Sequence, residues 1–376
     1  MTNIRICVNT LSFPPSHKGG VESVLFNLAK GFRILGYAKK ITYFCYQNIG
    51  KLLKEITPES EIVIIKDMIN EKHARISAQL VQTLKFHRLY EKYNFDVILF
   101  ASSEVGLFKY KVPTLIIPHD IQNVSRPEMN KNKIMFYLHY FSYKISFKNM
   151  DRIIAISDVD KQEIEKYYPF SKNKIIKIYD PIDMAEKEIK HVENKQEYIL
   201  AVNIQYEHKN IDTLIRAFSL FSKNHPRYKL YLAGAKNEYT NKLEELVKQL
   251  KLIEKVIFLG FIDKKQLVDY WSKAKLYINP SIFEGFGMTS VESIFYGAPT
   301  LLSDLAINRE VTQGLCAYYD DIKNPKALAA AMENSINEPY DKEVYLNKTK
   351  ILLQKYNLKE ISKQYLDVLV KSAKNK

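Results

Sequence analysis

Residues 275–303 read KLYINPSIFEGFGMTSVESIFYGAPTLLS, and this stretch predicts a strand, a glycine-rich turn, a helix and a second strand in succession. The run KLYIN is short and apolar, as in a buried strand. The run MTSVESIFY has the spacing of an amphipathic helix, which Gly297 and Pro299 end. Because open parallel sheets bind ligands beyond the carboxyl ends of their strands, the turn between this strand and this helix is a predicted ligand site.

The same alternation of short apolar runs and longer amphipathic segments continues along most of the chain. Near-continuous apolar strands separated by helices are typical of parallel sheets covered on both faces. A polar stretch at 184–197 interrupts the pattern, which then restarts. The sequence therefore predicts an α/β protein with two doubly wound domains facing a cleft. The predicted strands are 4–9, 40–46, 61–66, 96–101, 113–118, 151–157 and 174–179, followed by 198–203, 229–234, 255–260, 275–280, 299–304 and 315–320.

Composition limits the classes of protein to which this chain can belong. Its 376 residues give room for two ordinary domains. The net charge of +14 suits nucleic acid, an anionic membrane or a phosphorylated substrate, but it also suits lysines on solvated helix faces. Cys7 and Cys45 lie inside strand-like runs, so buried thiols are expected rather than disulfides. No secretory leader and no apolar run of roughly 18 residues is found, so a cytoplasmic protein is expected.

Two carboxylates flank the glycine-rich turn, Glu284 within it and Glu292 about one turn into the helix. Free N–H groups at the helix start favour an anion such as a diphosphate. Carboxylates repel phosphate, so hydroxyl-rich groups such as a sugar and a ribose are their natural partners. Alternatively, Glu292 only complements the helix dipole and Glu284 is solvated. The candidate residues that form the turn and the helix start are Gly285, Phe286, Gly287, Met288 and Thr289, and both glycines are expected to adopt positive φ.

With seven residues between its two glutamates, this stretch resembles the E-x7-E signature of the retaining glycosyltransferases of family 4, which have the GT-B fold of two Rossmann-like domains. SIFEGFGMTSVESIFYGAPTLLSD at 281–304 is the most specific part of the resemblance, and REVT at 309–312 continues it. The resemblance extends over most of the chain. It implies that Glu284 contacts hydroxyls of a donor sugar and that Glu292 holds the ribose of the nucleotide.

A second segment resembles the same family, YILAVNIQYEHKNIDTLIRAF at 198–218. Its pattern predicts a strand, a turn and a helix capped by Asn210. The resemblance implies that Lys209 stabilises the departing diphosphate, which needs a fixed positive charge. A solvated lysine before a helix is the alternative. The family often has arginine six residues before this lysine, where this chain has Asn203. Lys209 therefore has less help, and either the rate or the way the phosphates are held is expected to differ.

Two features of the first half resemble the family less specifically. Gly19 and Gly20 open a helix after the first strand, as in the family's glycine-rich loop, which approaches the diphosphate and the acceptor. His17 and Lys18 precede them and contribute either to that site or only to a solvated loop. His119 follows the strand PTLIIP, where the family has a histidine that faces the transferred sugar. A half-buried histidine bonded to local backbone is the alternative.

The second half and the domain junction contain further matches. In FLGFID, Phe261 and Ile262 correspond to the family's base-binding turn, whose backbone groups face the nucleobase. At the junction, residues 180–183 match the family motif imperfectly. The resemblance implies an acceptor-side domain over 1–183, a donor-binding domain over 184–355, and a C-terminal helix over 356–376 that crosses back to the first domain.

The function predicted from these residues is retaining transfer of a hexose-type sugar from a UDP- or GDP-sugar to a glycan or lipid-linked acceptor in bacterial surface polysaccharide assembly. No metal, no separate cofactor and no nucleic acid partner is expected. Three alternatives stay open: a GT-B phosphorylase or epimerase, a non-catalytic GT-B partner subunit, and a basic nucleic-acid-binding protein. Turnover with a nucleotide sugar, or a salt-sensitive gel shift, distinguishes them.

Residues 131–150 predict a helix with two apolar stripes on nearly opposite sides. One stripe can serve the domain core, whereas the other, with lysines between the stripes, suits the inner surface of an anionic cell membrane. The alternative is that both stripes are buried. The first stripe is Ile134, Leu138, Phe141 and Ile145; the second is Phe136, Tyr140, Tyr143 and Phe147; the lysines are Lys133, Lys144 and Lys148.

Overall fold

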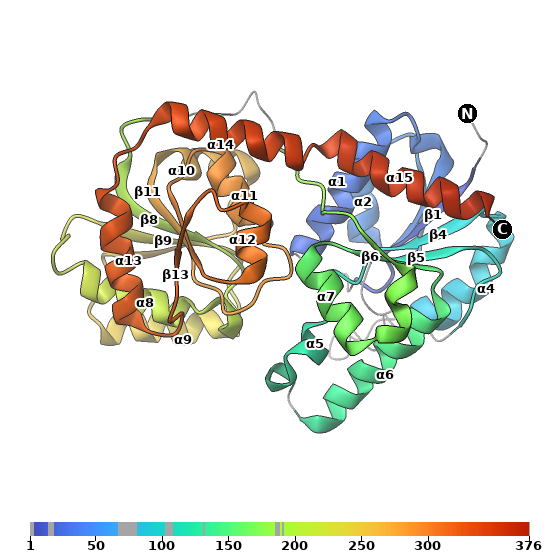
Figure 1. Cartoon of the computed structure of the whole chain (residues 1–376), viewed down its shortest axis with the longest axis horizontal. Coiled ribbons are helices and arrows are strands. Elements are labelled where there is room, and N and C mark those ends of the chain that lie inside the picture. Colours follow the sequence, from blue (N-terminus) through green and yellow to red (C-terminus); the bar gives the residue numbers. More distant parts are fainter. Residues whose placement is uncertain are drawn as a thin grey trace. The chain divides into compact units, whose positions relative to one another are not determined.

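The structure is a computed structural model that describes residues 4–13, 19–66, 81–101, 108–130, 132–184, 189 and 192–375. The chain divides into two compact units (Figure 1). One unit consists of Met1–Asp183 together with Tyr356–Lys376, and the other consists of Met184–Lys355. His17 and Lys18 lie outside the described residues.

The first unit is built on a parallel sheet of seven strands in the order β3-β2-β1-β4-β5-β6-β7. Each of the seven apolar runs predicted in this half contains one of these strands, so the prediction of a parallel sheet is confirmed. The strands are β1 (Ile6–Asn9), β2 (Ile41–Cys45), β3 (Glu61–Ile64), β4 (Val97–Phe100), β5 (Thr114–Ile116), β6 (Arg152–Ala155) and β7 (Ile175–Lys177).

Helices pack on this sheet around a core rich in aromatic rings, in which Phe44 and Phe86 meet edge to face at 5.1 Å between ring centroids. Cys7 and Cys45 are buried, free thiols, as predicted. The described α-helices of this unit are α1 (Gly20–Ile34), α2 (Gln47–Ile56), α4 (His87–Leu89), α5 (Gln122–Ser125), α6 (Lys133–Asn149), α7 (Asp158–Tyr167) and α15 (Leu358–Lys374).

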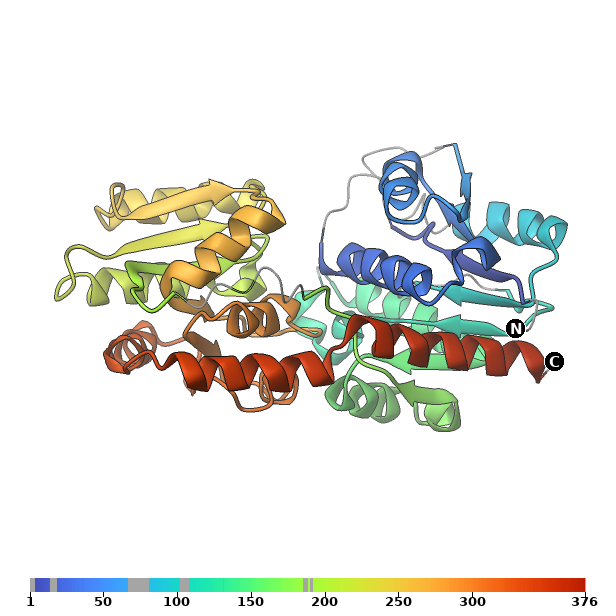
Figure 2. The ribbon, with the colours of Figure 1, turned by 90° about the horizontal axis from the view of Figure 1, so that it is seen from above.

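The C-terminal helix α15 belongs to this first unit, although the chain reaches it only after completing the second. Figures 1 and 2 both show α15 running beside α1. The two helices approach so closely that a Cβ added to Gly31 of α1 would lie 1.8 Å from Oγ of Ser362. Glycine at position 31 is therefore required for this helix contact.

The second unit repeats the architecture with six parallel strands in the order β10-β9-β8-β11-β12-β13. All six runs predicted in this half overlap one of them, with β8 and β11 beginning two residues and one residue before the predicted runs. The strands are β8 (Gln196–Val202), β9 (Lys229–Ala233), β10 (Val256–Gly260), β11 (Ala274–Asn279), β12 (Thr300–Ser303) and β13 (Ala317–Tyr319).

Helices cover both faces of this second sheet. The apolar faces of α8, α9 and α13 form one cluster with the strands, and Figure 1 shows α10, α11 and α14 on the opposite side. The described helices are α8 (Ile211–Phe221), α9 (Glu238–Gln249), α10 (Lys264–Lys273), α11 (Met288–Phe295), α12 (Ala306–Thr312), α13 (Pro325–Asn337) and α14 (Lys342–Lys355).

In each sheet the first strand of the unit lies beside its fourth, β1 beside β4 and β8 beside β11. The strand order reverses at these two points, and loops leaving the two central strands diverge to opposite faces there. Ligands of doubly wound proteins bind in the crevice that this divergence leaves. The residues that follow β8 and β11 are therefore the first to consider as a site.

Candidate functional site

Lys209 follows β8 and Glu284 follows β11, and the structure joins them in an ion pair at this switch point. Nζ of Lys209 lies 2.8 Å from Oε1 and 2.9 Å from Oε2 of Glu284. Only 18% of the lysine side chain and 9% of the glutamate side chain is exposed. The two residues that sequence analysis selected separately thus form one ion pair, and burial restricts the motion of both side chains.

Glu284 is ionised in this arrangement. Burial alone would raise the pKa of its carboxyl group, but the charge of Lys209 and the hydrogen bonds that it receives hold the pKa below the ordinary value. Nδ2 of Asn279, the last residue of β11, donates one of these bonds to Oε1 at 2.9 Å. An anionic carboxylate with further acceptor capacity can bind a hydroxyl of a ligand.

Two loops are held together beneath this ion pair. The amide of Ile282 donates to the carbonyl of His208 at 2.9 Å, and Nδ2 of Asn210 donates to the carbonyl of Pro280 at 3.0 Å. Asn210 has a left-handed backbone with φ of 55°, and its side chain makes no capping bond to the helix backbone. The prediction that Asn210 caps α8 through its side chain is therefore wrong, because that side chain is used to brace the neighbouring loop.

The turn after Glu284 ends at Gly287, which begins α11 with φ of 85°. Gly285, by contrast, is not among the described glycines with positive φ, so that part of the expectation is wrong. Phe286 between them is buried and anchors the turn. Among the described residues, the amides of Met288 and Thr289 have no backbone acceptor, as at the first turn of any helix.

Glu292 lies in α11 with only 14% of its side chain exposed, and its carboxylate forms an ion pair with Lys264 at the start of α10. The lysine ammonium also lies over the rings of Trp271 and Tyr296, at 5.5 and 5.3 Å from their centroids. The helix α10 therefore provides a cation that holds this carboxylate in place.

The other predicted residues of the second unit lie at the same carboxyl edge of the sheet. Asn203 follows β8, and its carbonyl packs so tightly on Gly234 that a Cβ there would approach within 1.9 Å. The side-chain amide nitrogen of Asn203 is buried and has no hydrogen-bond partner among the described residues. Phe261 and Ile262 follow β10, with Phe261 exposed and Ile262 partly buried.

In the first unit, His119 lies beyond β5 and is buried with φ of 63°. A left-handed backbone is strained for a residue other than glycine, and such strain concentrates at functional positions. One ring nitrogen, Nε2, lies 3.2 Å from the carbonyl of Ala101, which follows β4. Burial lowers the pKa of His119 to about 4, so its imidazole is neutral at physiological pH.

Gly19 and Gly20 lie at the start of α1, after β1. The carboxylate of Glu22 accepts a hydrogen bond from the amide of Gly19, so a side chain of the protein already uses one donor of this helix start. Gly19 has an extended backbone, with φ of −173°, which any residue can adopt. The loop geometry at Gly19 therefore does not require glycine for a left-handed turn.

Comparison with known proteins identifies the chain. The model of the family described as Glycosyltransferase Family 4 matches residues 18–186, and the model described as Glycosyl transferases group 1 matches residues 183–352. The chain belongs to the family 4 type of glycosyltransferases. A curated relative, the O-antigen chain mannosyltransferase RfbU of Salmonella typhimurium, is 30% identical over 58% of this chain. The chain spans only about 60% of that relative's length.

Solved structures share the GT-B fold of this chain. Sucrose-phosphate synthase from Thermosynechococcus elongatus superposes with a TM-score of 0.79 at 16% identity, over 98% of both chains. Alr3699/HepE from Anabaena, solved in complex with UDP-glucose, superposes with a TM-score of 0.72 at 17% identity, over 98% of this chain and all of the other. Identities this low show the fold alone.

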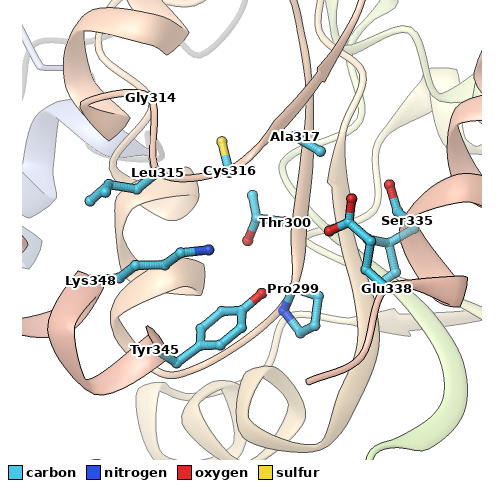
Figure 3. A pocket seen from close by; sticks show the side chains of 11 residues that line it. Pro299, Thr300, Gly314, Leu315, Cys316, Ala317, Ser335, Glu338, Tyr345 and Lys348 are labelled. Atoms are coloured by element: carbon cyan, nitrogen blue, oxygen red, sulfur yellow. The ribbon is translucent and has the colours of Figure 1, made fainter. Parts of the chain in front are cut away.

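A cavity of about 330 Å³ lies in the second unit, at the amino edge of its sheet and thus opposite the candidate site (Figure 3). Its lining includes Thr300 at the start of β12 and Ala317 at the start of β13. Figure 3 shows Lys348 and Tyr345 of α14 pointing into it. This cavity is therefore separate from the residues at the carboxyl ends of the strands.

Sequence reasoning missed two residues that contact the candidate site, Asn279 and Lys264. Asn279 ends the strand KLYIN at the edge where ligands bind, and that position was an available signal. Lys264 begins the helix after FLGFID, but nothing in the sequence pairs it with Glu292. The contact of Asn279 with Glu284 is local, five positions apart in the chain, whereas the contact of Lys264 with Glu292 joins segments 28 positions apart and depends on tertiary structure.

Proposed function

We propose that the chain transfers a hexose-type sugar from a nucleotide diphosphate sugar to an acceptor hydroxyl, with retention at the anomeric carbon and without a metal ion. The observation that carries this proposal is the Lys209–Glu284 ion pair at the switch point between β8 and β11. It combines a fixed cation for a leaving diphosphate with an ionised acceptor for sugar hydroxyls. In this proposal Met184–Lys355 binds the donor and the unit containing Met1–Asp183 binds the acceptor.

In the proposed reaction, the bond between the anomeric carbon and the diphosphate oxygen breaks as charge develops on the diphosphate. Lys209 and the free amides of Met288 and Thr289 stabilise that charge, since a fixed donor gains most where charge increases in the transition state. The acceptor oxygen bonds to the same face of the sugar. Its proton passes to an oxygen of the departing phosphate, so no protein nucleophile is required.

Glu284 and Glu292 are proposed to bind the two hydroxyl-bearing parts of the donor. Glu284 accepts hydrogen bonds from the transferred sugar, and Glu292 accepts them from the ribose diol. The glycine-rich turn, Gly285 to Gly287, lets the donor approach the backbone. Lys264 orients the carboxylate of Glu292 through their ion pair.

The remaining candidates take lesser roles in the proposal. Backbone groups of Phe261 and Ile262 contact the nucleobase, and the neutral imidazole of His119 hydrogen-bonds to the sugar. Gly19 and Gly20 lie beside the phosphates or the acceptor. Asn203, in the place of the usual arginine, leaves Lys209 as the principal side-chain cation for the diphosphate.

Relatives support a place in the assembly of bacterial surface glycans. RfbU is described as an O-antigen chain mannosyltransferase, and HepE was solved with UDP-glucose. We therefore propose a UDP- or GDP-hexose as donor, with mannose and glucose as the first sugars to test. The proposed acceptor is a glycan or a lipid-linked saccharide.

A thermal-shift panel of UDP-, GDP- and ADP-sugars tests the proposal, because a ligand that binds only the folded state raises the melting temperature. One nucleotide sugar is expected to raise the melting temperature, and Glu292→Ala is expected to reduce that shift. Lys326→Ala, at an exposed position in the same unit, is the matched control and retains the shift. If no nucleotide sugar stabilises the parent chain, the proposal fails. Turnover of a glycoside with inorganic phosphate instead would indicate a phosphorylase.

A further inference from the structure

Helix α6 of the first unit exposes an apolar surface that nothing in the described part of the chain covers. Ile134, Leu138 and Phe141 are 71, 58 and 51% exposed. At about 100° per residue, these three side chains lie within a narrow arc on one side of the helix. Tyr137 extends the arc and is also exposed. We call these four residues the outer stripe of α6.

The opposite side of α6 already anchors the helix to its domain. Tyr143 and Phe147 are buried in the core, and Phe136 and Tyr140 pack against it. The hydroxyl of Tyr168 donates to the carbonyl of Tyr140 at 3.2 Å. The interpretation that both stripes are buried is therefore wrong, and the outer stripe does not serve to hold the helix in place.

Basic side chains border the outer stripe, and α6 contains no acidic residue at all. Lys133, Lys144 and Lys148 make no ion pair among the described residues. Nζ of Lys144 lies 5.9 Å from the ring centroid of Phe141. Nζ of Lys148 lies 5.8 Å from the ring centroid of Phe170, which is itself exposed. The surface therefore combines exposed aromatic rings with uncompensated positive charge.

We propose that the outer stripe of α6 docks on the surface of an anionic lipid bilayer. Apolar and aromatic side chains can enter the boundary between headgroups and acyl chains, while adjacent lysines contact lipid phosphates. Each lysine near such a surface strengthens binding about fivefold. The net charge of +14 adds a long-range attraction to the same surface. Among the helices that the structure describes, none has the length and hydropathy of a transmembrane span.

Charge selects a lipid surface over a second copy of this chain. A symmetric dimer places the same patch against itself, so the lysines of two α6 helices would face each other without acidic partners. An anionic bilayer instead supplies the opposite charge over the whole patch. Docking on a bilayer is independent of sugar transfer and goes beyond the proposed function.

Co-sedimentation with vesicles of phosphatidylglycerol and of phosphatidylcholine tests the proposal on the full chain. The parent is expected to bind the anionic vesicles more tightly, with affinity that falls as salt is raised. Leu138→Gln with Phe141→Gln is expected to weaken binding at least about tenfold, because two large apolar side chains no longer enter the bilayer. Lys144→Glu with Lys148→Glu is expected to weaken it at least about tenfold through charge.

Two matched controls separate this helix from general effects. Lys359→Glu with Lys363→Glu makes the same charge change at the same spacing on exposed positions of α15. Ile253→Gln removes another highly exposed apolar side chain, in the second unit. Both are expected to bind vesicles like the parent. Because the variants replace side chains that are exposed or, in Lys144, only partly buried, unchanged melting temperatures are expected.

Several results would overturn the proposal. Recovery of the parent in the supernatant with both vesicle types would contradict it, and so would α6 variants that sediment like the parent. An equal loss of vesicle binding in the α15 control would show that the loss follows from net charge and not from the position of the lysines on α6. A concentration-dependent dimer that the Leu138→Gln, Phe141→Gln variant dissociates would assign the stripe to a second copy. None of these results affects the donor-induced thermal shift, so the two proposals fail separately.

Discussion

At the scale of single residues, the proposed site depends most on the ion pair between Lys209 and Glu284. The two residues are 75 positions apart in the chain. The pair fixes the lysine before any donor binds, so little ordering remains at the moment of reaction. The carboxylate also reduces the positive charge that the lysine presents, which makes geometry more important than charge alone. Both effects can be measured by substitution.

Lys209→Ala is expected to lower kcat far more than donor affinity, because the charge on the diphosphate grows as its bond breaks. Loss of one such fixed donor costs roughly 10²–10³-fold in rate. Steady-state kinetics with the identified donor measures the change. The substitution leaves Glu284 buried without its counter-charge, so the melting temperature is measured alongside. The double variant Lys209→Ala, Glu284→Ala removes that buried charge as well and is the control for stability. Turnover equal to the parent would make Lys209 a structural partner only.

Glu292→Ala is expected to weaken donor binding by roughly 1.5–3 kcal/mol, the contribution of a hydrogen bond to a charged group. Lys264→Met leaves the carboxylate in place but removes the cation that orients it, so a smaller loss of affinity is expected. Isothermal titration calorimetry with the donor and with the free nucleoside diphosphate measures both. Affinity equal to the parent in Glu292→Ala would remove this residue from the ribose site.

Asp180, buried in the first unit, gives an expected pH dependence of stability. Burial, and then the neighbouring Asp160, raise the pKa of Asp180 well above its ordinary value. The folded state therefore retains this proton better than the unfolded state, and stability falls as the pH rises above about 4 toward the folded pKa. Asp180→Asn lacks this loss, so its melting temperature is expected to exceed that of the parent increasingly at higher pH. A constant difference across that range would contradict the assignment.

At the scale of elements, the start of α11 depends on the left-handed backbone of Gly287. Its surroundings are open, since a Cβ there would meet nothing closer than 3.8 Å. The requirement for glycine is therefore conformational rather than steric. A substitution at this position strains the turn that carries Glu284 and the free amides.

Gly287→Ala is expected to destabilise the fold by about 1–2 kcal/mol, the cost of a left-handed backbone for alanine. Donor affinity is expected to fall as well, because the turn relaxes away from its position. Gly314→Ala is the matched control, with φ of 70° and open space around it, at a distance from the site residues in sequence. It should show the same loss in thermal denaturation with unchanged donor affinity. Equal donor affinity in both variants would mean that the turn geometry does not matter for binding.

At the scale of the whole molecule, the order of elements in the chain differs from their grouping in space. The segment Tyr356–Lys376 completes the unit begun by Met1–Asp183. Ile361, Tyr365 and Leu369 of α15 are buried there. Burial of each contributes about 1.5–3 kcal/mol, which together approaches the net stability of a typical domain.

Deletion of residues 356–376 is therefore expected to destabilise the first unit and to leave the second folded. Hydrogen exchange followed by mass spectrometry should show lost protection in β1 to β7 and retained protection in β8 to β13. The substitution Lys363→Glu, on the exposed face of the same helix, is the control and should retain protection in both units. Full protection of β1 and β4 after the deletion would show that α15 contributes little.

The sequence by itself determined the local elements of this protein. Every predicted apolar run coincides with a strand to within two residues at its start, and the turn around Gly287 precedes a helix as expected, because burial and backbone preference act over a few neighbouring residues. The same local periodicity predicted two stripes on α6 and placed Glu284 and Glu292 after a strand. It did not reveal that Asn210 braces a loop or that Gly285 avoids positive φ, since both depend on contacts beyond their own segments.

Only the tertiary structure decided which of these elements meet. The order of strands sets β8 beside β11 and so brings Lys209 to Glu284, and the packing of α10 beside α11 brings Lys264 to Glu292. Exposure of the outer stripe of α6 likewise follows from which side of the helix the core takes. These outcomes depend on the pairing of segments distant in the chain, where the free energy of burial is shared among many side chains and leaves no signal in any one stretch of sequence.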